Sequence, residues 1–156
     1  MAKNRLGLSI VGGALKAARC ATLWINARNL ASKDEHERAL PLVLQIYREL
    51  EVEGPSELAP IKTNLLFALI NTKVGDYQTA MKAAAVAKGQ LDSGNRTYRP
   101  EDHKYLSAYT DMTIDICRNP MGWEIHKYIK TKERFFEVNL SDVKQSIRDD
   151  FPIFLS

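Results

Sequence analysis

The stretch Ile61–Leu91, IKTNLLFALINTKVGDYQTAMKAAAVAKGQL, determines the expected fold, because it contains two helical segments joined by a tight turn. Gly75 can end the first helix in a left-handed conformation, and Asp76 can cap the second. The first half carries apolar or small residues at the i, i+3, i+4 and i+7 spacing of one helix face, namely Leu65, Leu66, Ala68, Leu69 and Thr72. We therefore predict an antiparallel helical hairpin.

Small residues mark where these two helices should meet. Ala68 lies on the first helix, and Ala80, Ala84 and Ala87 lie on the second. With only methyl groups between them, two helix backbones can approach to the short end of the usual range of about 8–10 Å. We expect these alanines to be buried at the helix–helix contact.

The same stretch resembles the tetratricopeptide repeat, best over residues 61–94. The resemblance is carried by Phe67-Ala68, by the turn Gly75-Asp76-Tyr77, and by Ala80 and Ala87 at successive spacings of 12 and 7 residues. It implies an all-α fold of stacked antiparallel helical hairpins, a solenoid of about two to three units. An ordinary antiparallel hairpin in a helical bundle is the alternative.

Flanking segments supply the other expected hairpins. We predict them at about residues 15–50 and 101–134, separated from the central one by the Pro- and Gly-containing joints 51–60 and 92–100. Together they would form a helical-repeat domain over residues 1–134, with a basic N-terminal segment at 1–14. An irregular C-terminal docking tail, residues 135–156, would follow.

Three local features refine these boundaries. Pro41 fits only a helix that starts near Glu37 or one that is kinked one turn in. The last helix of the third hairpin is expected at residues 123–134. In the tail, Ser141-Asp142 can cap a short helix that presents Val143 and Ile147.

In the tetratricopeptide family, the first helix of each hairpin lines a concave groove that receives a peptide or helix. Carried onto this chain, the resemblance implies an aromatic and apolar partner groove. The residues that it assigns to this groove are Trp24, Arg28, Leu65, Leu69, Tyr105 and Tyr109. The alternative for each is a core position beneath a neighbouring helix.

Charge is concentrated at the start of the chain. Residues 1–33 contain six basic residues and no acidic one, whereas the whole chain has 22 basic and 19 acidic residues. Such a segment can be a mitochondrial-type targeting sequence, an arm for an anionic partner, or a first helix with solvated charges. The side chains that would contact nucleic acid or another anionic surface are Lys3, Arg5, Lys16, Arg19 and Arg28.

The C-terminal tail ends in an apolar sequence, FPIFLS. An exposed patch of this composition would be adhesive, so we expect Phe151, Ile153 and Phe154 to dock, either onto this domain or onto another subunit. We also predict self-association through these three residues.

The sequence offers little catalytic chemistry. Cys20 and Cys117 match no metal-ligand or disulfide spacing, and His36, His103 and His126 are isolated from one another. Cys20 lies between Lys16 and Arg19 on one side and Arg28 on the other, which would favour thiolate, but its apolar neighbours favour a buried thiol. We expect no cofactor, no metal and no enzymatic activity.

Composition completes the prediction of function. The chain is 45% hydrophobic and 26% charged, and no apolar run reaches the roughly 18–20 residues that span a bilayer. We predict a non-catalytic protein–protein interaction module, an adaptor or accessory subunit that serves as a scaffold in a larger assembly of protein subunits. An intracellular location, cytoplasmic or mitochondrial, fits this function. A nucleic-acid or anionic-surface binder is the alternative.

Overall fold

The computed structural model describes residues 2–49, 58–93 and 98–153, and it describes side chains at residue 16 and from residue 18 onward. All regular structure in these ranges is helical, with no strand, which confirms the all-α class. The chain divides into two compact units, Met1–Glu51 and Val52–Ser156. The boundary between the units therefore falls inside the predicted domain 1–134. In the described ranges, no helix is both long enough and apolar enough to cross a membrane.

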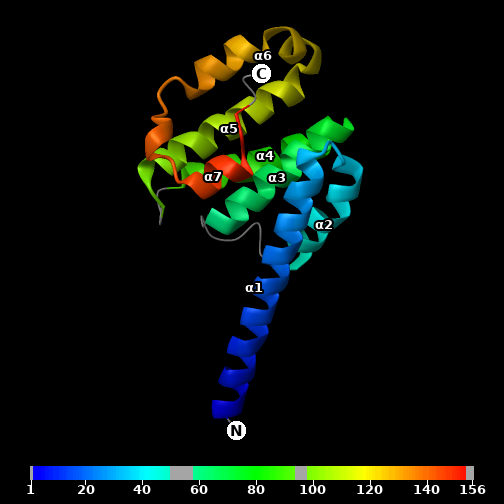
Figure 1. Cartoon of the computed structure of the whole chain (residues 1–156), viewed down its shortest axis with the longest axis vertical. Coiled ribbons are helices and arrows are strands. Elements are labelled where there is room, and N and C mark those ends of the chain that lie inside the picture. The colour runs from blue at the N-terminus through cyan, green and yellow to red at the C-terminus, as the bar shows by residue number, and fades with distance from the viewer. Residues whose placement is uncertain (1, 50–57, 94–97, 154–156) are drawn as a thin grey trace. The chain divides into compact units, whose positions relative to one another are not determined.

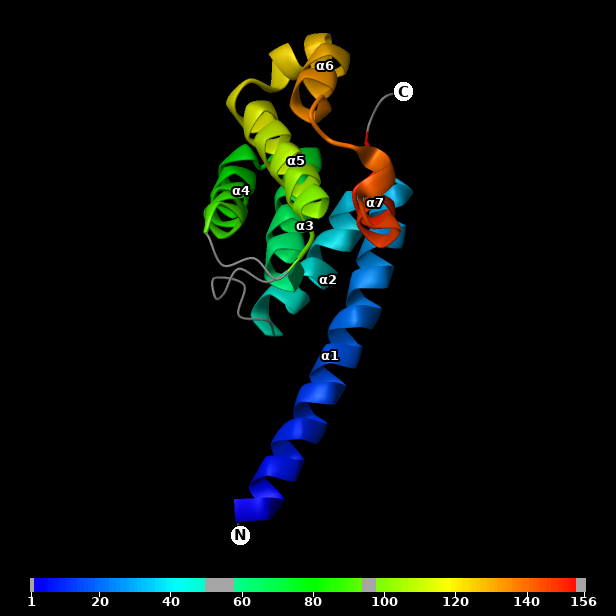
Figure 2. The same ribbon diagram turned by 90° about the vertical axis from the view of Figure 1, so that its left-hand side faces the viewer.

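The first unit is a hairpin of α1 (Ala2–Ser32) and α2 (His36–Glu49), which run side by side (Figures 1 and 2). Helix α1 begins at Ala2 and so includes the predicted basic segment. Asp34 adopts a φ of 60° in the turn, where the amide of Glu35 donates to the carbonyl of Leu30 at 2.9 Å. Helix α2 begins at His36, close to the start near Glu37 that Pro41 favours.

The second unit starts with the central hairpin, formed by α3 (Leu58–Val74) and α4 (Tyr77–Asp92). Gly75 has a φ of +86°, and the carboxylate of Asp76 accepts from the amide of Thr79 at 3.1 Å. The predicted turn is thus confirmed at both residues. The hydroxyl and amide of Thr79 also lower the pKa of the Asp76 carboxyl, because both stabilise its charged form.

Small side chains and one polar pair join α3 to α4. Ala68, Ala80, Ala84 and Ala87 are fully buried, which confirms the predicted contact. Beside them, the Asn64 amide nitrogen donates to the Gln90 side-chain oxygen at 3.0 Å. This buried bond fixes the position of one helix relative to the other.

Helix α5 (Pro100–Arg118) packs on both α3 and α4, and α6 (Pro120–Phe135) packs on α5. Figures 1 and 2 both place α5 between the central hairpin and α6. Helix α6 begins at Pro120, three residues before the predicted start. Asn119 explains the difference, because its side chain accepts from the amide of Gly122 at 3.0 Å and caps the helix ahead of Trp123.

The tail contains a 3₁₀ turn, η1 (Leu140–Asp142), and a short helix, α7 (Gln145–Asp150). The short helix starts later than predicted, because Ser141 and Asp142 lie in η1 rather than at its cap. Ile147 lies on the short helix, as predicted, whereas Val143 lies before it, directly after η1; both side chains are buried. The tail therefore adds to the core of the second unit.

Candidate protein-interaction surface

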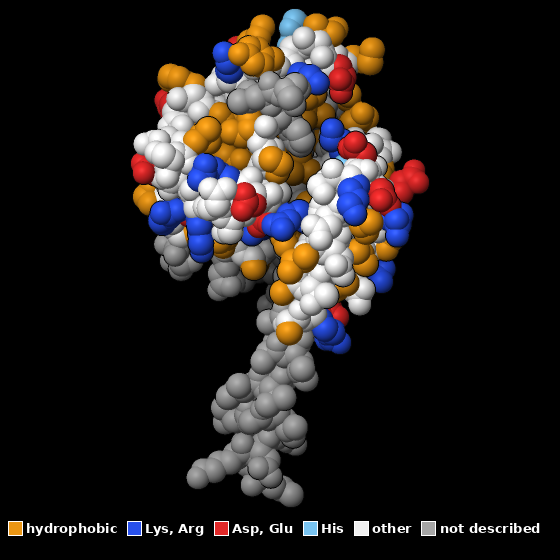
Figure 3. All heavy atoms as spheres, in the orientation of Figure 1, with side chains coloured by type: hydrophobic (Ala, Val, Ile, Leu, Met, Phe, Trp, Pro, Cys, Tyr) orange, Lys and Arg blue, Asp and Glu red, His pale blue; other side chains and the backbone are white. Residues whose placement is uncertain are grey.

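The outer side of α6 exposes a row of large apolar side chains. Its apolar members have between 52% and 79% of their surface exposed, although apolar side chains of this size are usually buried. Helix α6 lies at the top of Figure 1, and Figure 3 shows hydrophobic side chains on the surface there. We call this row, with the lysine that lies within it, the α6 face: Met121, Ile125, Tyr128, Ile129, Lys132 and Phe136.

Helical periodicity places these residues on one side. They recur at intervals of three, four and seven residues, which keeps them on one stripe of a helix with 3.6 residues per turn. The inward side of α6 carries its two buried residues, Thr131 and Phe135. The ring of Phe135 lies 5.3 Å from Tyr105 and 5.6 Å from Tyr109, centroid to centroid. This aromatic contact anchors α6 to α5 and leaves the α6 face outward.

Two opposite charges accompany the α6 face. The Lys132 ammonium lies over the Tyr128 ring, 4.4 Å from its centroid. Glu124 precedes Tyr128 by one helical turn and is exposed. In the part of the chain that the structure describes, neither Lys132 nor Glu124 forms an ion pair. Both charges are free to meet a partner.

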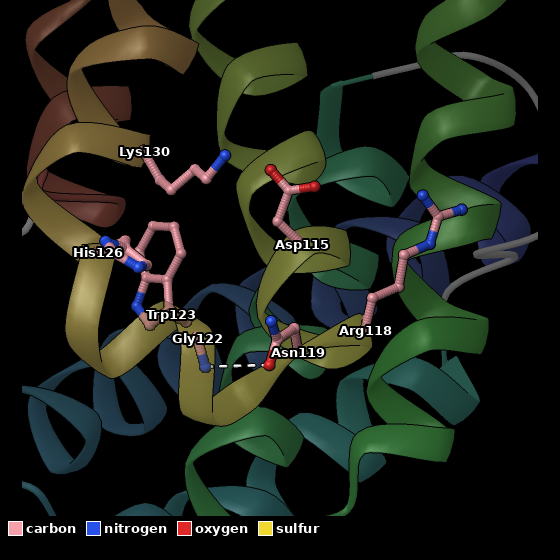
Figure 4. Close-up of a pocket in the computed structure, with 7 residues that line it drawn as sticks. All are labelled: Asp115, Arg118, Asn119, Gly122, Trp123, His126 and Lys130. Atoms are coloured by element: carbon pink, nitrogen blue, oxygen red, sulfur yellow. Dashed lines mark hydrogen bonds between the residues drawn. The ribbon is translucent and has the colours of Figure 1, made fainter.

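A shallow hollow of about 240 Å³ lies between the end of α5 and the start of α6, lined by residues of α6 that are not part of the α6 face. Figure 4 shows Trp123, His126 and Lys130 on one side of it, and Asp115 and Arg118 on the other. The Asp115 carboxylate accepts from Arg134 at 2.8 Å, so it already has a partner. The lining contains no activated nucleophile with an adjacent base, and we assign no chemistry to the hollow.

The predicted partner groove is not an open surface in this structure. Leu65, Tyr105 and Tyr109 are buried, and Leu69 is partly buried. Trp24 and Arg28, both partly buried, belong to the first unit. In this structure the chain's own tail covers Tyr105 and Tyr109 of α5.

The tail is held on α5 by aromatic contacts and hydrogen bonds. The Phe151 ring lies 5.6 Å from that of Tyr109. The hydroxyl of Tyr105 donates to the carbonyl of Phe151, and the hydroxyl of Tyr109 donates to the carbonyl of Pro152. Burial raises the pKa of both tyrosines, since a tyrosinate would lose its hydration here.

Carboxylates at the start of α5 bind the backbone of the tail. Asp102, which is buried, accepts from the amide of Lys144 at 2.8 Å, and Glu101 accepts from the amide of Asn139 at 3.0 Å. Together with Lys104, the latter bond lowers the pKa of the Glu101 carboxyl, with Lys104 the larger cause. The acidic first turn of α5 thus positions the tail.

Of the predicted docking residues, Phe151 is buried within its own chain. Ile153 is partly buried, and Phe154 lies outside the described residues. Of the two docking alternatives, the structure contains the intramolecular one. The Phe151 side chain is therefore unavailable for the predicted self-association in this conformation.

Among the basic side chains of α1 that the structure describes, few are both exposed and unpaired. Lys16 is exposed, and the Arg19 guanidinium lies 3.6 Å from the Glu49 carboxylate, which partly neutralises it. Arg28 is partly buried, and the side chains of Lys3 and Arg5 lie outside the described part. Binding of an anionic partner through this segment stays a prediction.

Both cysteines are poor nucleophiles in this structure. Burial and the nearby Glu49 raise the pKa of the Cys20 thiol, and these effects outweigh Lys16 and Arg19. Burial also raises the pKa of Cys117. Within the described ranges, no group of three or more His, Cys, Asp or Glu residues is arranged to hold a metal ion.

Sequence reasoning missed the α6 face. The sequence predicted residues 123–134 as the last helix of the third hairpin, but it assigned no binding role to either side of that helix. A usable signal was present, because Met121, Ile125, Ile129 and Phe136 form one stripe, while the anchor Phe135 lies on the adjacent side. A helix with more apolar surface than one neighbour can cover is expected to have a second neighbour.

Comparison of the chain with protein-family models, with curated proteins and with solved structures finds no match. The tetratricopeptide resemblance therefore continues to rest on residues 61–94 alone.

Proposed function

We propose that this chain is a non-catalytic protein-interaction module, an adaptor or accessory subunit, and that its α6 face receives an amphipathic helix of a partner. The observation that carries the proposal is the exposure of Met121, Ile125, Ile129 and Phe136 on one stripe. Contiguous apolar surface of this kind commonly marks a protein-binding site. Burying it would supply the main driving force for association.

The form of the surface favours a helical partner. The stripe follows a helix of 16 residues, which is about 24 Å long at 1.5 Å per residue. Its members are spaced to interlock with apolar residues at i, i+3, i+4 and i+7 of another helix. An extended peptide would instead need an open sheet edge or a narrow groove, and the described residues contain no strand.

A tetratricopeptide-like arrangement gives the surface a structural role. In support, α3–α4 and α5–α6 are consecutive helix pairs, and α3 and α5, the first helices of the two pairs, contact each other. Terminal units of a helical stack need a polar outer side to be soluble alone. Because α6 has an apolar outer side, we propose that a partner's helix continues the stack there.

The proposal is tested by capture of partners from the native source. The variant Ile125→Asp/Ile129→Asp should capture each specific partner in an amount more than about tenfold lower than the wild type does, since charges placed among central contacts remove their binding energy. His126→Asp/Lys127→Asp, on the other side of the same exposed helix, should retain capture. Circular dichroism should show both variants folded. Equal capture by both variants would place the binding surface elsewhere.

A further inference from the structure

The α6 face also indicates which helix it receives. Building on the proposed function, we propose that the partner is the α6 helix of a second copy of this chain, packed antiparallel about a two-fold axis. The axis would pass between Tyr128 and Ile129. Three features of the face, namely its spacing, its charges and its area, support this arrangement.

The spacing of the face is symmetric. Each member has a counterpart equally far on the other side of the midpoint between Tyr128 and Ile129. In a two-fold contact, residue i of one copy meets residue j of the other, and j meets i. Antiparallel pairing about that midpoint therefore covers every member of the face: Met121 meets Phe136, Ile125 meets Lys132, and Tyr128 meets Ile129.

The two free charges become complementary in this pairing. Lys132 of one copy lies opposite Ile125 of the other, and Glu124 is the neighbour of Ile125. A lysine side chain is long and flexible enough to reach a carboxylate one residue further along. Both Lys132 and Glu124 lack an ion-pair partner within the described chain, and the two-fold axis would provide each of them with one. A parallel pairing would instead bring Lys132 against Lys132 of the other copy.

The available area is sufficient. The α6 face has two aromatic side chains, each of which can bury roughly 150–250 Å², and three smaller apolar ones, and all five are more than half exposed. They offer on the order of 500 Å² per copy, so two copies would bury about the 1,000 Å² that a specific interface needs. The contact would be near the lower end of stable interfaces, so association should depend on concentration.

Sedimentation of the purified full-length chain tests the pairing. The wild type should pass from monomer to dimer with rising concentration, and Ile129→Asp should weaken association by at least about tenfold. Ile129 is more than half exposed, so the substitution should leave the fold intact. His126→Asp, which makes the same change of charge off the face, should associate as the wild type does. A wild-type chain that remains monomeric throughout would overturn the proposal.

A charge exchange tests the antiparallel register. Lys132→Glu and Glu124→Lys should each associate about tenfold more weakly, because each alone places two like-charged pairs across the axis. An equimolar mixture should recover association as a heterodimer, because one variant then has a carboxylate at both positions and the other has an ammonium at both. Both contacts across the axis would again join opposite charges. This register would be refuted if both variants dimerise as strongly as the wild type. It would also be refuted if the mixture associates no more strongly than either variant alone.

Failure here differs from failure of the proposed function. If Ile125→Asp/Ile129→Asp loses a captured protein while the wild type is always monomeric, the α6 face binds another chain and the second-copy proposal is wrong. If the double variant changes neither capture nor sedimentation, both proposals are wrong.

Discussion

Helices α5 and α6 are consecutive and similar in length, with 19 and 16 residues, yet they have opposite surroundings. Helix α5 buries nine residues, whereas α6 buries Thr131 and Phe135. The α3–α4 hairpin, α6 and the tail all pack on α5, and Figure 2 shows α6 beyond it. We therefore expect the central helix α5 to contribute mainly to the stability of the unit. We expect the apolar side of the peripheral helix α6 to contribute mainly to binding.

Two tyrosines give the sharpest test of this difference. Tyr109 of α5 is fully buried, and Tyr128 of α6 is half exposed. Tyr109→Ala should lower the free energy of unfolding by about 3–5 kcal/mol, because it leaves a cavity among aromatic rings. Tyr128→Ala should change it by no more than about 0.5 kcal/mol. Urea denaturation, at a concentration low enough to prevent association, would measure both, and similar losses would show that α6 is also a core helix.

Two phenylalanines extend the comparison to the tail. Phe151 is buried against α5, and Phe136, at the end of α6, is largely exposed. Phe151→Ala should cost about 3 kcal/mol, at the low end for a buried phenylalanine, because a segment near the chain end can relax. Phe136→Ala should leave the urea midpoint nearly unchanged. If Phe151→Ala also leaves the urea midpoint nearly unchanged, the tail does not belong to the core.

Local chemistry explains what could be predicted from the sequence. The turn at Gly75 and Asp76 depends on residues at most three positions apart, and the buried alanines depend on helical periodicity. Both signals are contained in one short stretch. The expected start of α6 is wrong because asparagine is common both in turns and at helix caps, so the sequence alone did not show that Asn119 caps the helix.

Long-range contacts explain what could not be predicted. The bond between Tyr109 and Pro152 joins residues 43 positions apart, and the bond between Tyr105 and Phe151 joins residues 46 apart. The resemblance assigned Tyr105 and Tyr109 to a groove, but no local pattern could show that the tail covers them. Periodicity likewise could not distinguish which stripe of α6 faces inward, because that depends on the position of α5.

The smallest expected effect concerns the hydroxyls of Tyr105 and Tyr109. Folding raises the pKa of both above the unfolded value of about 10, because they are buried. A group whose pKa is raised by folding stabilises the fold below its unfolded pKa, and this contribution is lost as the pH rises toward the folded pKa. A tyrosinate also cannot donate to the carbonyls of Phe151 and Pro152. The wild type should therefore keep this stability up to about pH 10 and lose it progressively as the pH rises further.

The matched control for this prediction is Tyr105→Phe/Tyr109→Phe, which keeps both rings and removes both ionisable hydroxyls. At neutral pH it should be less stable by about 1 kcal/mol for each lost hydrogen bond. Its urea midpoint should fall less steeply with alkaline pH than that of the wild type, since only the other ionisable groups still titrate. Parallel curves for the two proteins would mean that these hydroxyls are hydrated rather than bonded to the tail. In that case the tail would not cover α5 as the structure has it. The distinction between a covered α5 and an exposed α6 would then be wrong.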